Sequence, residues 1–161
     1  MALPRCARAW LKVERAELDP RMPDKTEETH GFIAALPHAK ALGMRLDLLD
    51  AGVAVLSMPY DARLVGDTTT GVMHGGAVSA LMDTCCGAAV INHPQSLAGT
   101  ATIALRIEYL RPATPGQRIT TRAECYHVTR SVAFVRAVAT DEDAERPVAH
   151  ATGTFTVERR L

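Results

Sequence analysis

The sequence predicts an α+β fold in which a curved antiparallel sheet wraps around one long buried helix. Residues 75–91 form an apolar segment of helical length that holds a single charged residue, Asp83. A helix that is apolar on nearly all sides is buried on most of its surface. From residue 102 onward, apolar and polar residues alternate between turn signals, which is typical of antiparallel strands. The length of 161 residues favours one domain with a substantial core.

The first forty residues predict a helical extension to this domain. Basic residues mix there with Trp10 and other apolar residues, which indicates a short amphipathic helix. A second helix is expected from Thr26, and Pro37 should end or kink it. We therefore divide the chain into an N-terminal helical extension, residues 1–40, and a sheet domain, residues 41–161.

The sheet domain is expected to open with a hairpin. Apolar residues alternate with polar ones on both sides of Asp50-Ala51-Gly52, and this triplet has good turn chemistry. Residues 59–73 show little periodicity and many small polar side chains, so we interpret them as a loop that leads into the buried helix.

Four strands are expected in the C-terminal half of the chain, over residues 102–109, 118–128, 131–140 and 147–158. In the first strand, strict alternation places Thr102 on the polar face, opposite to Leu105, Ile107 and Tyr109. One buried helix followed by these strands gives the curved sheet of the predicted fold.

Composition excludes several classes of function. The 18 basic residues balance 18 acidic ones, which argues against a nucleic-acid surface or a polybasic membrane patch. No apolar run reaches the roughly 20 residues that span a bilayer, and no secretory signal is evident. We expect a cytoplasmic protein; a mitochondrial presequence is the competing interpretation, and two N-terminal glutamates count against it. The four cysteines and six histidines have no metal-ligand spacing, so no metal is expected.

The helix start and its one carboxylate are the candidate functional site. A lone Asp in an apolar helix destabilises the fold unless it is paired, hydrated or used. At the start of the helix, Gly75 and Gly76 allow the backbone to present bare N–H groups that face a ligand. Without a function, Asp83 would be a structural carboxylate and the glycines would only permit close packing.

These residues carry a resemblance to the hotdog-fold acyl-CoA thioesterases of the PaaI type. The resemblance extends over residues 43–158 by order of elements. Its specific part is the His-Gly-Gly to Asp83 spacing, together with the strand Thr102–Ala113, TIALRIEYLRPA. The full motif consists of Gly71-Val72-Met73-His74-Gly75-Gly76, then Leu81, Asp83 and Gly87, followed by that strand.

The resemblance implies an acyl-CoA thioesterase with a hotdog fold. It implies that Gly75 offers its backbone N–H to the thioester carbonyl and that Asp83 acts as nucleophile or as general base. It also implies that the Thr102 hydroxyl positions water or substrate. One departure concerns Thr68, where many relatives have Asn or Gln, so a polar contact from this position to substrate is in question.

Three further residues complete the candidate set. His74 is a candidate catalytic residue, although capping of the helix is the role that we favour for its side chain. Gly76 is a candidate for substrate binding through its backbone. Arg111 is a candidate for the phosphates of coenzyme A, although most exposed arginines are only solvated. No cofactor is expected, because coenzyme A is part of the substrate.

The spacing of Gly75 and Asp83 predicts a homodimer. Eight residues of helix separate them by about 12 Å, whereas a carbonyl and the group that attacks it lie within about 3–3.5 Å. One chain therefore does not supply both groups to one site. A two-fold dimer with antiparallel helices solves this, as the resemblance also implies, and a dimer of dimers is expected.

Two other classes of function stay open from the sequence. One is a hotdog module that binds acyl-CoA without cleaving it, which the departure at Thr68 keeps open. The other is a hotdog hydratase or dehydratase, for which His74 and Asp83 would be the acid and base, at a spacing that fits poorly. An acyltransferase that uses Cys85 or Cys86 is more distant, because neither has a base or cation nearby in sequence.

Overall fold

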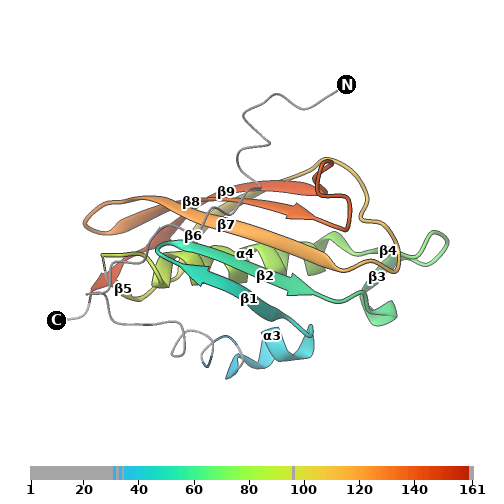
Figure 1. Cartoon of the computed structure of the whole chain (residues 1–161), viewed down its shortest axis with the longest axis horizontal. Helices are drawn as coiled ribbons and strands as arrows, with labels where there is room; N and C mark the ends of the chain where they lie inside the picture. The colour runs from blue at the N-terminus through green and yellow to red at the C-terminus, as the bar shows by residue number, and fades with distance from the viewer. Residues whose placement is uncertain (1–30, 32, 34, 96, 160–161) are drawn as a thin grey trace.

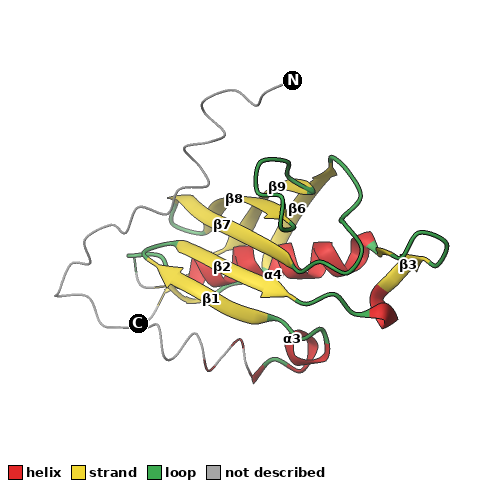
Figure 2. Ribbon diagram, turned by 45° about the vertical axis from the view of Figure 1, so that its right-hand side comes forward, coloured by secondary structure: helices red, strands yellow, loops and turns green. Residues whose placement is uncertain are grey.

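The computed structural model describes residues 31, 33, 35–95 and 97–159, and it confirms the predicted α+β architecture. A 17-residue helix, α4 (Gly75–Ile91), lies against a six-stranded antiparallel sheet with the strand order β1-β2-β7-β8-β9-β6 (Figure 1). Turned by 45°, the same structure shows the sheet curving around α4 (Figure 2). The predicted helices within residues 1–30 lie outside the described residues, and the division at residue 40 stays a prediction.

The strands and helices have the following bounds. The sheet contains β1 (Arg45–Asp50), β2 (Val53–Met58), β6 (Thr102–Tyr109), β7 (Ile119–Val128), β8 (Val132–Thr140) and β9 (Ala149–Thr156). The smaller elements are α3 (Pro37–Ala41), η1 (Ala62–Leu64), β3 (Val65–Asp67), β4 (Val72–Met73), β5 (Leu97–Gly99) and β10 (Glu158–Arg159).

The apolar composition of α4 explains its central position. The helix packs mainly on β7, β2 and β8, and Leu81, Met82, Cys85 and Cys86 have no exposed surface. The facing sheet positions are small or aliphatic residues that share one side of each strand, so helix and sheet approach closely. The helix is buried on most sides, as its sequence predicts.

The predicted hairpin is formed by β1 and β2. Its turn residues Ala51 and Gly52 have φ angles of 32° and 90°. Positive φ at both central residues is the pattern of a type I′ turn, whose twist matches that of paired strands.

Two parts of the sequence prediction need correction. Residues 59–73 are not a plain loop, because β3 and β4 form a small antiparallel hairpin there that projects beyond the sheet (Figure 1). The expectation for Pro37 agrees with the structure, because residues 31, 33 and 35 are helical and the helix stops at the extended Leu36. Pro37 then begins α3, since its fixed φ suits the first helical position. The strand β5 was also not predicted.

The strand β6 forms one edge of the sheet and pairs only with β9 among the described strands. A register shift between Thr102 and Ala104 interrupts its alternation. As a result Thr102 reaches a side chain of α4, so its predicted place on the face opposite to Leu105 and Ile107 was wrong. A β-bulge of this kind re-aims a side chain, and alternation alone does not reveal it.

Candidate active site

The N–H groups at the start of α4 have different partners. His74 is the N-cap residue, and its Nδ1 accepts a hydrogen bond from the N–H of Gly76 at 2.9 Å. The His74 carbonyl accepts from the N–H of Ala77 at 3.0 Å. Within the described part of the chain, the N–H of Gly75 has no hydrogen-bond partner. The helix therefore presents one free donor, at its positive end.

His74 thus has the capping role that the sequence favoured. Because Nδ1 accepts a hydrogen bond, the neutral ring carries its proton on Nε2. The same cap occupies the N–H of Gly76, so the predicted substrate contact of Gly76 stays a prediction and would need another group or a broken cap.

A side chain at either glycine would crowd its neighbours. A Cβ at Gly75 would lie 3.2 Å from the ring and hydroxyl of Tyr109, and one at Gly76 would lie 2.9 Å from His74 Nδ1. The chain therefore packs closely around the helix start, as the alternative role of the glycines predicts. This packing and the free N–H of Gly75 are compatible.

Asp83 and Thr102 are brought together. The Thr102 hydroxyl donates a hydrogen bond of 2.8 Å to Oδ1 of Asp83. Asp83 is half-buried on α4 and faces the start of β6. The contact joins residues 19 positions apart and gives the lone carboxylate of α4 one fixed donor, with its other oxygen left for a ligand or water.

Tyr109 and Ser79 lie near Gly75 and are functional candidates that were not predicted from the sequence. The Tyr109 hydroxyl donates to the Gly75 carbonyl at 2.6 Å and lies 2.6 Å from Ser79 Oγ. Ser79 Oγ also contacts the same carbonyl, at 3.1 Å. This network holds Tyr109 of β6 over the first turn of α4. A tyrosine at a strand end carries no signal of such a contact.

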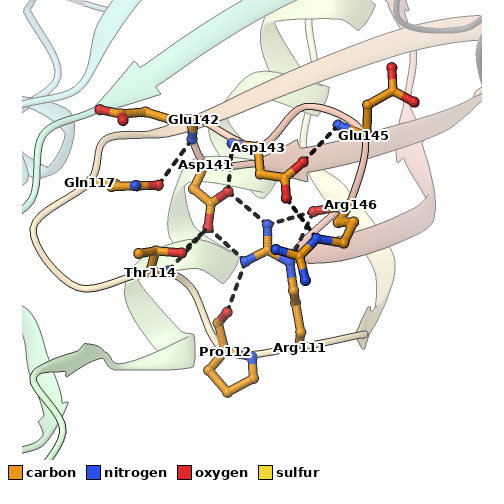
Figure 3. Close-up of polar contacts among 9 residues, drawn as sticks. All are labelled: Arg111, Pro112, Thr114, Gln117, Asp141, Glu142, Asp143, Glu145 and Arg146. Atoms are coloured by element: carbon orange, nitrogen blue, oxygen red, sulfur yellow. Dashed lines mark hydrogen bonds and ion pairs between the residues drawn. The ribbon is translucent and has the colours of Figure 1, made fainter.

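Arg111 belongs to a buried cluster rather than to an exposed cation site (Figure 3). Its guanidinium forms two hydrogen bonds of 2.7 Å to the two oxygens of Asp141, whose side chain has 0% exposure. Its other donors reach the carbonyls of Pro112 and Arg146. All five N–H groups are therefore used within the chain, which leaves none for the predicted phosphate contact.

The cluster fixes two connections of the sheet. Asp141 follows β8, and it also accepts from the N–H and hydroxyl of Thr114, in the connection after β6. The Arg111 guanidinium holds the pKa of the Asp141 carboxyl well below its usual range. Asp141 was not predicted, because the pair is separated by 30 residues.

The remaining predicted residues lie outside this geometry. Thr68 is exposed in the turn between β3 and β4, and its contact with substrate stays a prediction. Burial raises the pKa of the Cys85 thiol to about 12, and the pKa of Cys86 is raised for the same reason. Neither is suited to act as a thiolate nucleophile. No three His, Cys, Asp or Glu side chains of the described residues are grouped to hold a metal ion.

Two cavities flank the start of α4. The first, which we call the Gly75 cavity, has a volume of about 360 Å³ and is lined by Val72, Met73, Gly75, Val78, Tyr109, Leu110, Arg111, Pro112, Ala113 and Val148. The second, the His74 cavity, has a volume of about 350 Å³ and is lined by His38, Leu42, Arg63, Leu64, Val65, His74, Gly76, Ala77 and Ala80. Gly75 itself lines the first cavity, and its neighbours His74 and Gly76 line the second.

Comparison with known proteins connects this geometry to a family. A model of the thioesterase superfamily matches residues 70–148, which include α4, β6 and both connections held by Arg111. The medium/long-chain acyl-CoA thioesterase YigI of Escherichia coli (strain K12) is 29% identical over 139 residues, 78% of this chain and 88% of that protein. The acyl-coenzyme A thioesterase PaaI of the same strain is 35% identical over 89 residues, 55% of this chain and 60% of that protein.

Solved structures give the same result. The crystal structure of a thioesterase family protein from Silicibacter pomeroyi is 30% identical and has a TM-score of 0.74, over 84% of this chain and 98% of that chain. In the part of the present chain that the structure describes, none of the helices has the length and apolar character needed to cross a bilayer.

Proposed function

The chain belongs to the thioesterase superfamily, and on that premise we propose that it hydrolyses acyl- or aryl-acyl-CoA to the free acid and coenzyme A. The observation that carries this proposal is the free N–H of Gly75 at the start of a buried 17-residue helix. No cofactor takes part, since coenzyme A belongs to the substrate. We place the protein in the cytoplasm, which suits its free, buried Cys85, Cys86 and Cys125.

The helix start would stabilise the charge that develops on the thioester oxygen. The N–H of Gly75 lies at the end of α4 where the helix dipole is positive, and Tyr109 packs beside it. A pre-organised donor of this kind typically contributes a factor of about 10²–10³ to the rate. The His74 cap supports this by fixing the backbone on either side of Gly75.

Asp83 would supply the attack. It either activates a water molecule or attacks the carbonyl carbon to form a mixed anhydride, which water then opens. The hydrogen bond from Thr102 orients the carboxylate and leaves its second oxygen for this task. Coenzyme A leaves as a thiolate, and it needs little acid assistance because thiols are fairly acidic.

We propose that the site is shared between two subunits. Gly75 and Asp83 lie about 12 Å apart along one straight helix, too far to act on one carbonyl. The edge strand β6 offers the means to pair, because Ile103, Tyr109 and Leu110 on or beside it are about half exposed. An uncovered apolar edge strand is a template for pairing with another chain.

The contacts of β6 specify how the subunits would pair. At one end of this strand Thr102 contacts Asp83, and at the other end Tyr109 contacts Gly75. An antiparallel pair of β6 strands centred between Leu105 and Arg106 places Thr102 opposite Tyr109 of the partner subunit. Asp83 then approaches Gly75 of the partner subunit. Two such dimers would form the expected dimer of dimers.

Thiol release from acyl-CoA substrates tests this function. The full chain is assayed on a panel of short, long, branched and aryl substrates, beside an Asp83→Asn variant. We expect hydrolysis by the wild type and a loss of about 10²–10⁴-fold in the variant. Asp47→Asn, an exposed aspartate of β1, is the matched control and should leave the rate unchanged. Binding of acyl-CoA without thiol release would instead favour a non-catalytic module.

A further inference from the structure

We propose that Tyr109 is a positioning residue for thioester hydrolysis, because its hydroxyl group fixes the backbone of Gly75, the residue whose N–H would bind the thioester oxygen. This inference rests on the proposed function and adds a residue to it. In this role Tyr109 acts through the Gly75 backbone rather than on the substrate. The strand β6, which carries Tyr109, thereby controls the direction of the N–H donor at the start of α4.

The backbone of Gly75 needs an external contact to keep one direction. Glycine has more conformational freedom than any other residue, and Gly75 is the first residue of α4. The His74 side chain binds the N–H of Gly76 and not that of Gly75. Within the described chain the Gly75 N–H has no hydrogen-bond partner, so no bond to this group itself fixes its direction. A donor stabilises a transition state best when it is held in place before the reaction.

Two hydroxyl groups hold the Gly75 carbonyl instead. The Tyr109 hydroxyl donates to this oxygen at 2.6 Å, and Ser79 Oγ lies 3.1 Å from the same oxygen and 2.6 Å from the Tyr109 hydroxyl. Distances of 2.6 Å are at the short end of the range for O–H···O bonds. The two shortest contacts are both satisfied when Ser79 donates to Tyr109 and Tyr109 donates to Gly75. The bonds then form a continuous chain, in which each strengthens the next.

Tyr109 links this group of atoms to the sheet. Ser79 belongs to α4 itself, one turn after Gly75, whereas Tyr109 is the last residue of β6. At the other end of the same strand, the Thr102 hydroxyl donates to Asp83 at 2.8 Å. One strand therefore holds both proposed reacting groups of its own chain. These bonds lie within one chain, and burial of the Tyr109 ring at the proposed subunit seam would strengthen them, because hydrogen bonds are stronger away from water.

Removal of the hydroxyl group alone tests the proposal. Tyr109→Phe keeps the ring beside Gly75 and deletes the bond to its carbonyl. We expect kcat for acyl-CoA hydrolysis to fall by about tenfold, less than the 10²–10³-fold that loss of the donor itself typically costs, while KM changes by less than about twofold. An equal loss in kcat and kcat/KM is the sign of an interaction made only in the transition state. Ser79→Ala, which leaves the bond from Tyr109 to Gly75 in place, should have a smaller effect in the same direction.

Tyr126→Phe is the matched control. Tyr126 on β7 is exposed to a similar extent as Tyr109, 51% against 48%, and its ring lies beside Arg136 rather than at the helix start. Loss of its hydroxyl group should leave kcat and KM unchanged. Sedimentation and thermal unfolding check that the variants assemble and fold as the wild type does. An unchanged kcat in Tyr109→Phe, or a rise in KM alone, would overturn the proposal.

The mobility of the Gly75 backbone gives a readout that does not depend on catalysis. The full chain is labelled with ¹⁵N-glycine, and NMR order parameters are measured for the wild type and for Tyr109→Phe. We expect a value of about 0.85, that of rigid backbone, for Gly75 in the wild type and a fall toward about 0.6 in the variant, while Gly87 within α4 stays unchanged.

The two readouts distinguish this inference from the proposed function. Equal order parameters for Gly75 in the wild type and in Tyr109→Phe would overturn the positioning role even if thioesters are hydrolysed. A fall in the order parameter of Gly75, in a protein that hydrolyses no thioester, would support the contact from Tyr109 and contradict only the proposed function.

Discussion

The backbone of Gly75 unites the two properties that the site requires. Its missing Cβ gives room to the Tyr109 ring, and its N–H is the donor at the start of α4 that the described residues leave unpaired. The preceding residue, His74, is extended with ψ at 134°. Extended backbone is what proline requires of the residue before it, and proline is well tolerated at the first helical position. A proline at position 75 would therefore remove the N–H donor and still allow α4 to begin there.

We expect Gly75→Pro to lower kcat for acyl-CoA hydrolysis by about 10²–10³-fold relative to Gly75→Ala. Both variants add a Cβ against Tyr109, which must move by a few tenths of an ångström, but only proline removes the N–H. The ratio of the two rates therefore isolates the donor. Circular dichroism and thermal unfolding check that both variants keep α4. Equal rates for the two variants would show that the Gly75 N–H does not contact the reacting oxygen.

At the scale of elements, the connections after β6 and β8 are joined by Arg111 and Asp141. The Asp141 carboxylate is buried, its pair with the half-buried Arg111 is bidentate, and Thr114 supports it. Arg111 also lines the Gly75 cavity, beside Leu110 and Ala113 of the same connection. Breaking a buried pair leaves an uncompensated charge, which costs more than the pair itself contributes.

Asp141→Asn should lower the free energy of unfolding by about 3 kcal/mol at pH 7. The folded-state pKa of Asp141 is depressed by Arg111, so its stabilisation is complete above the ordinary aspartate pKa of about 3.9 and is lost as the pH falls below that value. The difference in the free energy of unfolding between the wild type and the Asp141→Asn variant should therefore decrease in acid. Urea titrations from pH 7 down to pH 3 measure it. Asp143→Asn, in the exposed pair with Arg146, is the control and should have a much smaller effect; a constant gap down to pH 3 would contradict the pKa argument.

The elements themselves could be predicted where the pattern is local. The bounds of α4 follow from its apolar run between two glycines and Asn92, and the turn between β1 and β2 follows from Asp50-Ala51-Gly52. Its type I′ geometry, with Ala51 at positive φ, does not follow from the sequence. The β3–β4 hairpin was missed because its residues are small and polar, and the position of Thr102 was wrong because a bulge shifts the register.

The site could be predicted in part for the same physical reason. Gly75, His74 and Asp83 lie on or next to one helix, so their spacing is visible in the sequence. The partners of Arg111 and Tyr109 are 30 or more residues away. Such contacts depend on how strands are ordered in the sheet, which a single sequence does not record.

At the scale of the whole molecule, the proposed site requires two chains. One subunit would contribute the N–H of Gly75 and the other the carboxylate of Asp83, because antiparallel β6 strands bring the two helices together in opposite directions. This arrangement has a consequence that a site within one chain would not have: two different inactive chains could restore one active site when they pair.

Co-expression of Gly75→Pro and Asp83→Asn chains with different tags tests this. Each variant alone should be inactive, whereas random pairing yields half heterodimers, each with one intact site, so the mixture should recover about a quarter of wild-type activity. The double variant is the matched control, since it restores nothing. Co-expressed with an equal amount of wild type, it should reduce activity per wild-type chain by about half, because each mixed dimer lacks one group at both sites. No recovery in the first mixture, with full wild-type activity in the second, would mean that each chain acts alone.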